Sequence, residues 1–280
     1  MSTVAPTDLE SVIADLAEHE DAELLAGGTD FMVEVNHGHR RPTRVVSLHR
    51  VEELRRWTRD GDRLIIGAGV THATLEGEPF LELVPVLAQA ARTVGSPQIR
   101  NAGTIGGNLA TASPAGDTLP PLAALGATVT LAGPAGRRTL DLGDYITGPK
   151  RTSRDRTEVI VSVEVPVLDG PQEYLKVGTR NAMVISVAGV AFVVDRAGRN
   201  VRCALGSVGP VPIRATGAEA WLGREIDWEA GRVSADAAAE FGDQVAAASM
   251  PIDDHRSTAR YRRHAIGVCA RRAVLRCFPG

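Results

Sequence analysis

The chain has 280 residues, of which 44% are hydrophobic and 23% charged, and its formal net charge at pH 7 is -3. This composition is that of a globular protein with one large domain or two modest ones. Because both signs of charge are spread along the chain, it offers no basic face for nucleic acid and no polybasic patch for a membrane surface.

Other classes of protein are excluded by what the sequence lacks. No apolar stretch reaches the roughly 18 residues that could span a bilayer, and the first residues carry no cationic start followed by an apolar run, as a secretory signal would. We therefore expect a cytoplasmic protein without membrane insertion. The three cysteines, Cys203, Cys269 and Cys277, lack any CxxC spacing, so we expect buried free thiols and no disulfide, zinc or iron–sulfur site.

The N-terminal part of the chain alternates short helices and strands. Thr7 to Glu10 reads as a capping box, and apolar residues follow it at helical spacing from Leu9 to Ala17. The next expected elements are three strands and one helix, over Ala22–Ala26, Arg44–Leu48, Arg63–Ile66 and Leu81–Val94. The dense Gly, Asn, Ser, Pro and Thr content of Gly95 to Pro121 predicts a long loop, which its interleaved apolar residues keep ordered.

Strand patterns return after this loop at Ala127–Ala132 and Glu158–Val167, and a second region begins near Gly170. This region contains three expected strands and then three helices: Tyr174–Val177, Val184–Asp195, Val201–Val208, Ala215–Leu222, Ser234–Ala248 and Ser257–Cys277. The last helix carries apolar residues on one stripe and arginines on the other side, which is typical of a packed helix with a solvated basic face. The order of elements predicts an α+β protein.

Two short glycine-rich motifs stand out: Ala26-Gly27-Gly28-Thr29-Asp30 and Thr104-Ile105-Gly106-Gly107-Asn108. Paired glycines beside a hydroxyl residue allow a backbone to come close to phosphate oxygens and to offer N–H groups in a concave nest. Two such motifs could hold one diphosphate from both sides. Each glycine pair also fits an ordinary turn, and neither motif matches the GxGxxG pattern or the GxxxxGKS/T pattern.

The stretch from Gly95 to Asn108, continuing to Asp117, resembles the signature of the FAD-binding medium subunits of molybdenum hydroxylases, the xanthine dehydrogenase and carbon monoxide dehydrogenase type. The motif at Ala26–Asp30 stands at the matching place near the N-terminus. Three other segments match more loosely, namely Val159–Pro166, Tyr174–Arg180 and Tyr261-Arg262-Arg263. The resemblance covers essentially the whole chain.

This resemblance implies a bi-lobed FAD-binding domain of the PCMH type over residues 1–168. A small lobe of about residues 1–52 and a larger lobe of about residues 53–168 would hold an extended FAD between them. A smaller α+β domain of the carbon monoxide dehydrogenase flavoprotein type, residues 169–280, would follow. The second region that begins near Gly170 agrees with this division.

The resemblance also assigns binding roles to matching residues. It implies that the two motifs hold the diphosphate of FAD, through Ala26, Gly27, Gly28, Thr29, Asp30, Thr104, Ile105, Gly106, Gly107 and Asn108. Asp117 matches an acidic residue that binds the dinucleotide, although a turn or capping aspartate would look the same. Lys176 matches a lysine near the flavin, where a cation would stabilise negative charge on the ring; a solvated strand lysine is the alternative. Ile160 matches an apolar contact position and also fits plain core.

The sequence shows no molybdenum-cofactor site, no cluster-binding cysteines and no nucleophile paired with a base. The resemblance therefore implies a large molybdenum-cofactor subunit and a small [2Fe–2S] subunit as partners, arranged as a dimer of heterotrimers. FAD would pass electrons from the clusters to NAD, a quinone or another acceptor. Two alternatives stay open: a free-standing FAD oxidase or reductase of the same fold, and a non-catalytic nucleotide-binding module.

Overall fold

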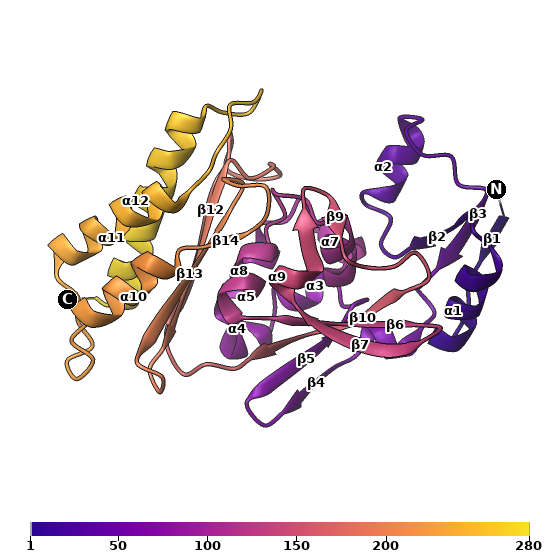
Figure 1. The fold of residues 1–280 in the computed structure, drawn as a ribbon, viewed down its shortest axis with the longest axis horizontal. Helices are drawn as coiled ribbons and strands as arrows, with labels where there is room; N and C mark the ends of the chain where they lie inside the picture. The colour runs from indigo at the N-terminus through magenta and orange to yellow at the C-terminus, as the bar shows by residue number, and fades with distance from the viewer. Residues whose placement is uncertain (1, 280) are drawn as a thin grey trace.

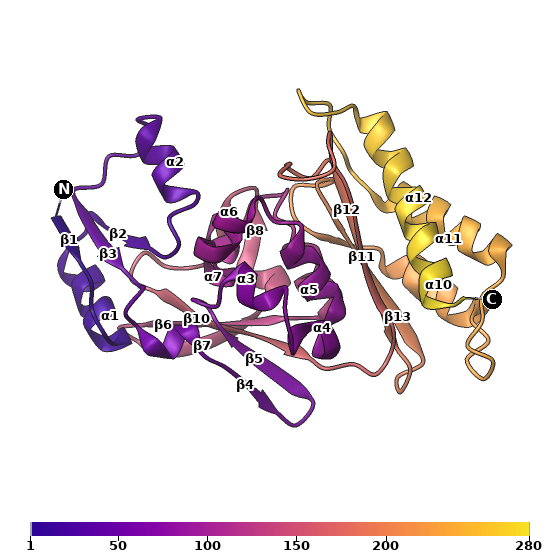
Figure 2. The same ribbon diagram turned by 180° about the vertical axis from the view of Figure 1, so that it is seen from behind.

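The computed structural model describes residues 2–279, and its elements form three successive units along the long axis of the molecule (Figures 1 and 2). An N-terminal unit lies at one end, a five-stranded sheet with its helices lies in the middle, and a four-stranded sheet covered by helices lies at the C-terminal end. Helices and strands are mixed in every unit, which confirms the predicted α+β class.

A three-stranded parallel sheet builds the N-terminal unit. Its elements are β1 (Ser2–Val4), α1 (Leu9–Glu18), β2 (Ala22–Leu25), α2 (Phe31–Asn36) and β3 (Arg44–Ser47), with β3 between the other strands. The cap of α1 lies one residue later than the expected Thr7. Asp8 is the N-cap and accepts the N–H of Ser11 at 2.8 Å, because the helix begins at Leu9 and Ser11 is its third residue.

The middle unit is built on an antiparallel sheet of order β4-β5-β10-β6-β7. Its strands are β4 (Trp57–Asp60), β5 (Arg63–Gly67), β6 (Thr128–Gly133), β7 (Gly136–Asp141) and β10 (Val159–Pro166); β8 (Ile146–Gly148) and β9 (Arg151–Thr152) form a separate hairpin. Its helices are η1 (Glu52–Arg55), α3 (His72–Leu75), α4 (Phe80–Leu83), α5 (Pro85–Arg92), α6 (Pro97–Ala102), α7 (Ile105–Thr111), α8 (Leu119–Leu125) and α9 (Leu142–Tyr145). Helices α5 and α8 lie between this sheet and the C-terminal sheet (Figure 1).

The single helix predicted over Leu81–Val94 is wrong. The chain forms two helices there, α4 and α5, which meet at Val84. Pro85 has no N–H group to continue the hydrogen bonds of α4, and its fixed φ suits the first position of a new helix. The proline therefore divides one apolar stretch into two short helices.

The long loop predicted from Gly95 to Pro121 is also wrong, because α6, α7 and the start of α8 occupy most of it. Hydroxyl residues that suggested a loop are helix N-caps in the structure. Ser96 accepts the N–H of Ile99, and Thr104 accepts the N–H of Gly107. Such caps satisfy backbone donors that the first turn of a helix leaves free.

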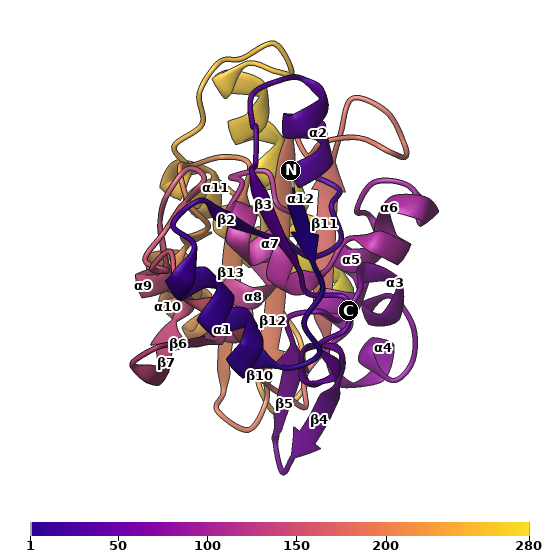
Figure 3. The same cartoon turned by 90° about the vertical axis from the view of Figure 1, so that its right-hand side faces the viewer.

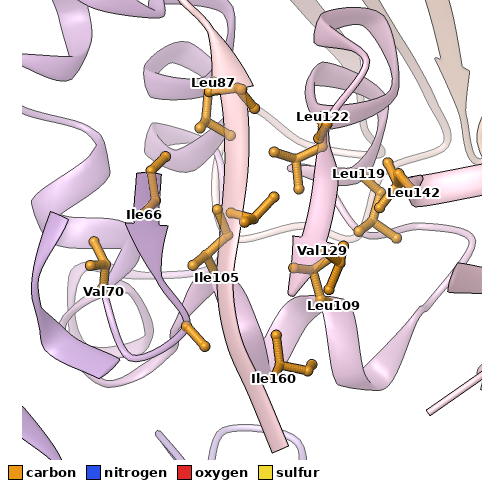
Figure 4. Close-up of a cluster of buried hydrophobic side chains, with 14 of the residues drawn as sticks. Ile66, Val70, Leu87, Ile105, Leu109, Leu119, Leu122, Val129, Leu142 and Ile160 are labelled. Atoms are coloured by element: carbon orange, nitrogen blue, oxygen red, sulfur yellow. The ribbon is translucent and has the colours of Figure 1, made fainter. Parts of the chain in front are cut away.

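The core of the middle unit gathers around α7. Ile105 and Leu109 of this helix are completely buried and belong to one cluster with Ile66 of β5, Val129 of β6 and Ile160 of β10 (Figure 4). A close-packed core resists rotation of a helix, because rotation would expose buried methyl groups and open cavities. The core therefore fixes which residues of α7 face outward.

The C-terminal unit is an antiparallel sheet of order β11-β12-β13-β14, with three helices. Its elements are β11 (Gln172–Val177), β12 (Ala188–Asp195), β13 (Asn200–Gly206), β14 (Ile213–Arg214), α10 (Thr216–Glu225), α11 (Ala235–Ala248) and α12 (Ala259–Cys277). Along β12, Val190 and Phe192 join the cluster under these helices, whereas Ala191 and Val193 join the core of the middle unit. Strand β12 is buried on both faces, which explains its continuous apolar sequence.

Two strands of this unit are shorter than predicted. β12 begins at Ala188 instead of Val184, and β13 ends at Gly206 instead of Val208. Met183 and Ser207 have positive φ angles of +50° and +63°, which turn the backbone away from an extended ladder. The prediction that all three cysteines are buried is confirmed.

One arginine of α12 is buried, although the predicted arginine face of this helix is solvated. Arg262 is 2% exposed and donates to the carbonyls of Val187 at 3.0 Å and Ser207 at 2.8 Å. It also donates to Asp254 Oδ1 at 2.5 Å. Burial acts to raise the pKa of Asp254, but hydrogen bonds from Arg256 and Arg262 outweigh it and hold this pKa well below its usual range. Arg262 thus links the residues that flank β12 and β13, Val187 and Ser207, to the segment before α12.

Replacing Arg262 by Met should lower the free energy of unfolding by about 3 kcal/mol, because two buried carbonyl groups would lose their side-chain donor and Asp254 would lose one of its donors. Urea denaturation followed by circular dichroism measures this change. Arg263→Met alters an exposed neighbour on the same helix and is the control, with an expected change below about 0.5 kcal/mol. Equal losses in the two variants would show that the buried contacts of Arg262 contribute nothing specific.

Candidate functional site

The two glycine-rich motifs lie next to each other, although they are far apart in the sequence. A Cβ atom on Gly27 would lie 1.8 Å from the carbonyl oxygen of Ala102, at the end of α6. Only glycine therefore allows the backbone of the N-terminal unit to come this close to the middle unit. A second contact joins the first motif to the helix that the second motif begins, since the Thr111 hydroxyl at the end of α7 donates to Asp30 Oδ2 at 3.0 Å.

The first motif connects β2 to α2 and presents a row of free backbone donors. The N–H groups of Gly27, Gly28, Thr29 and Asp30 have no hydrogen-bond acceptor within residues 2–279. Gly28 has a φ of +77°, in the left-handed region that favours glycine. Consecutive N–H groups around such a turn form a concave site that suits an anion.

The second motif forms the N-cap and first turn of α7, so its glycine pair is not the ordinary turn that the sequence also allowed. The N–H groups of Ile105 and Gly106 donate to the carbonyls of Val70 at 3.0 Å and Ala68 at 2.8 Å. These hydrogen bonds hold α7 against the segment that follows β5, so neither N–H group is free to bind a phosphate. Fewer backbone donors are therefore available here than in the first motif.

The two glycines of the second motif have different surroundings. A Cβ atom on Gly106 would lie 2.5 Å from the Cβ of Ala68. This glycine therefore allows α7 to pack closely against the segment that follows β5. A Cβ atom on Gly107 would meet only Oγ1 of Thr104, at 3.1 Å. Gly107 and Asn108 are partly exposed, whereas Gly106 is buried. The accessible side of the second motif is therefore formed by Gly107 and Asn108.

Asp117 lies beside the second motif because both of its neighbours contact Asn108. The Thr118 hydroxyl donates to Asn108 Oδ1 at 2.7 Å, and a Cβ atom on Gly116 would lie 3.1 Å from the same oxygen. Both contacts involve the amide oxygen of Asn108. Its amide nitrogen has no acceptor in the described part of the chain. The segment after α7 thus folds back along the helix and brings Asp117 to it.

Asp117 and Lys176, which come from different units, form a buried ion pair. Lys176 Nζ lies 2.7 Å from Asp117 Oδ2 and also donates to the Thr93 carbonyl at 3.0 Å. The hydroxyl of Tyr174, two residues earlier on β11, donates to Asp117 Oδ1 at 3.1 Å. Burial raises the pKa of Asp117, while Lys176 and Tyr174 act against that rise. A solvated strand lysine, the alternative for Lys176, is excluded because its side chain is 8% exposed.

Two predicted site residues, Ile105 and Ile160, lie away from the open surface of the motifs. Ile105 and Ile160 are in the core, where Figure 4 shows them with the side chains that pack under α7. Ala26 is partly buried and continues the chain from β2 into the first motif. Some of the predicted site residues therefore support the motifs from the core, and others form the accessible face of the motifs.

Sequence reasoning missed His72, which begins α3 and lies against the second motif. Its backbone N–H donates to the Gly103 carbonyl at 3.0 Å, and its side-chain Nδ1 is enclosed without a hydrogen-bond partner. Burial, followed by the charge of Arg100, lowers the pKa of His72 to about 4. A single histidine after a strand forms no sequence pattern, so only the tertiary fold reveals its position.

The chain matches two known protein families. Residues 1–168 match the family described as the FAD binding domain in molybdopterin dehydrogenase, and residues 173–277 match the CO dehydrogenase flavoprotein C-terminal domain. The chain belongs to the FAD-binding medium subunits of the molybdenum hydroxylases. The family resemblance and the FAD cofactor inferred from the sequence are both confirmed.

Relatives of this medium subunit are oxidoreductase subunits. It is 32% identical over 280 residues to the carbon monoxide dehydrogenase medium chain of Hydrogenophaga pseudoflava, covering 96% of this chain and 94% of that protein. It is 33% identical over 222 residues to a putative xanthine dehydrogenase FAD-binding subunit of Escherichia coli, covering 75% of each. The crystal structure of quinoline 2-oxidoreductase from Pseudomonas putida 86 contains a chain with a TM-score of 0.90 and 27% identity, covering 99% of this chain and 96% of that one.

The residues of this flavoprotein fit an FAD molecule on physical grounds. The four N–H groups without acceptors at Gly27–Asp30 can bond diphosphate oxygens, and the open face at Gly107 leaves room for a close approach. The ammonium of Lys176 donates to two oxygens and has a third proton for a ligand.

Within residues 2–279, no helix is long and apolar enough to cross a membrane.

The lowered pKa of His72 predicts how the stability of this flavoprotein depends on pH. Unfolded His72 takes up a proton near its ordinary pKa of about 6.5, whereas the folded protein excludes that proton until about pH 4. Stability should therefore decrease as the pH falls through this interval, by roughly 3 kcal/mol from this residue.

Urea denaturation of the wild-type protein and of His72→Gln, at pH 7 and at pH 4.5, isolates this contribution. The wild type should lose about 2 to 3 kcal/mol more than the glutamine variant, which has no titrating group at this position. Equal losses in the two proteins would mean that His72 is protonated normally in the folded state.

Proposed function

We propose that this flavoprotein transfers electrons within a heteromeric molybdenum hydroxylase. It would receive them from the [2Fe–2S] clusters of a small partner subunit and deliver them from FAD to an external acceptor such as NAD. The observation that carries the proposal is that the first motif, with free N–H groups at Gly27–Asp30, contacts the end of α6 and, through Asp30, α7. The same helix α7 has an open side at Gly107. When bound, FAD supplies the redox chemistry, and the chain positions it.

The diphosphate of FAD is proposed to lie between the two motifs. The backbone N–H groups of Gly27, Gly28, Thr29 and Asp30 act as donors on one side. Gly107 and the Asn108 amide line the other side. Neither motif contains a lysine or arginine, so oriented backbone dipoles stabilise the anion in place of a side-chain cation. Ala26, Thr104, Ile105 and Gly106 contribute by fixing the backbone of these segments.

The flavin ring is proposed to lie at Lys176. Asp117 and the Thr93 carbonyl fix two of the three ammonium protons of this lysine, so the third is held in one direction. A cation held in this way stabilises negative charge on the ring without first having to reorganise. Asp117 acts on the dinucleotide through the lysine that it orients. Ile160 contributes as a core residue that supports α7.

The chain is proposed to consist of an FAD-binding domain over residues 1–168 and a C-terminal domain over residues 169–280, consistent with the matched family ranges. Its Hydrogenophaga relative is a medium chain, which supports a complex with a large molybdenum-cofactor subunit and a small [2Fe–2S] subunit. We propose that this complex is a dimer of heterotrimers. Burial raises the pKa of all three cysteines, so these thiols stay protonated and are poor metal ligands.

The proposed diphosphate position predicts the effect of Gly107→Val. The added side chain would fill the open face of α7 and block the approach of the phosphates, so FAD affinity should fall by at least about 100-fold while the fold remains intact. Flavin fluorescence titration of the apoprotein, together with thermal unfolding, measures both effects. Gly217→Val is a matched control, because Gly217 lies in α10 with no atom within 4 Å of an added Cβ. Normal FAD affinity of Gly107→Val would place the diphosphate elsewhere.

The proposed electron transfer predicts the behaviour of the native complex. The protein should copurify with a molybdenum subunit and a [2Fe–2S] subunit, and reduction of the complex by its substrate should bleach the flavin absorbance. In stopped-flow measurements, Lys176→Met should slow flavin reduction by about 100-fold and leave cluster reduction nearly unchanged.

Lys150→Met is the control for this experiment, because Lys150 is the only other lysine of the chain and its side chain is 66% exposed. The double variant Lys176→Met/Asp117→Asn removes the buried charge that the single variant leaves unpaired, and it separates misfolding from loss of the cation. If the isolated chain oxidises an organic substrate with FAD and no partner, the free-standing oxidase replaces the subunit proposal.

A further inference from the structure

The histidine that begins α3 is joined to the second motif through the backbone. Thr71, the N-cap of α3, forms an isolated β-bridge with Thr104, the N-cap of α7. The N–H of His72 donates to the Gly103 carbonyl at 3.0 Å, and the N–H of Ile105 donates to the Val70 carbonyl at 3.0 Å. The start of α3 and the start of α7 are therefore held in one fixed arrangement.

The imidazole of His72 lies between this bridge and the first motif. A Cβ atom on Gly103 would lie 3.2 Å from His72 Cδ2 and 3.5 Å from Thr29 Oγ1. The Cδ2–Nε2 edge of the ring and the hydroxyl of Thr29 therefore both lie beside Gly103. Because Gly103 has no side chain, it leaves space for the ring beside the first motif.

The packing of the ring does not account for its polar atoms. His72 is 3% exposed, yet no residue of the described chain bonds to either ring nitrogen. A leucine would fill similar space without the cost of an unsatisfied polar group, which is about 1 to 3 kcal/mol. Nδ1 is fully enclosed, and enclosed N–H groups without acceptors are rare. We therefore assign the proton to Nε2, the nitrogen that is not fully enclosed.

We propose that His72 is a further FAD-binding residue, whose Nε2–H donates a hydrogen bond to the diphosphate beside Thr29. The inference rests on the proposed position of the diphosphate between the two motifs. The ring is neutral when it acts, since burial lowers the pKa of His72 to about 4. Arg100, the nearby cation, is occupied by Glu76 at 2.9 Å. His72 thus adds one directed donor, and no charge, to a site that lacks cationic side chains in its motifs.

A pair of variants separates this role from space filling. His72→Leu removes the donor and keeps a side chain of similar size, whereas His72→Gln keeps an N–H at a similar position. Fluorescence titration of the apoproteins should show FAD binding about tenfold weaker in the leucine variant and within about threefold of wild type in the glutamine variant. ADP, which shares the diphosphate and lacks the flavin, should lose affinity by a similar factor in the leucine variant.

Three results would overturn the inference: unchanged FAD affinity in His72→Leu, an equal loss in both variants, or a loss for FAD without one for ADP. If the leucine variant does not fold, ¹⁵N NMR of histidine-labelled wild-type protein decides, because FAD should shift the protonated Nε2 signal of His72. Gly107→Val separates the proposed role of His72 from the proposed position of the diphosphate. If that variant loses FAD and His72→Leu does not, this inference fails alone; if Gly107→Val binds FAD normally, the proposed diphosphate position fails as well.

Discussion

The binding region depends on two places where backbones come closer than any side chain would allow. Gly27 lies against the carbonyl of Ala102, and Gly106 lies against Ala68, with a Cβ atom excluded in both cases. The first contact joins the N-terminal unit to α6, and the second sets α7 against the end of β5. The glycines of each motif therefore have distinct tasks. Gly27 and Gly106 bring the segments together, while Gly28 and Gly107 shape the surface on which the diphosphate is proposed to lie.

The sequence predicted where the two motifs lie and what they resemble, but not that the second is helical. Gly106 and Gly107 are poor helix formers, and the surrounding Ser, Asn and Pro residues suggested a loop. Two contacts that are not local reverse that preference. Ile105 and Leu109 are anchored in the core, and the N–H groups of Ile105 and Gly106 bond carbonyls of another segment. Helix propensity is a weak preference that such tertiary contacts override.

The same limit applies to the site. Asp117 and Lys176 were each identified from family resemblance, whereas their ion pair depends on β11 packing beside the segment that precedes α8. No spacing rule in one sequence connects residues of two units. His72 was missed for a related reason. Its position near the motifs is defined by Gly103 and Thr29, which lie in other segments of the chain. All eight predicted strands occur, since the alternation or continuity of apolar residues is a local property. Six strands with weaker patterns were not predicted, namely β1, β4, β7, β8, β9 and β14.

The Asp117–Lys176 pair also crosses the boundary between two hydrophobic cores. Asp117 belongs to the middle unit, Lys176 to the C-terminal unit, and the first motif to the N-terminal unit. A dinucleotide in the proposed position would contact all three units and bind only when they are assembled. Ligand occupancy and folding would then be coupled, so that bound cofactor holds the three units together and stabilises the folded chain.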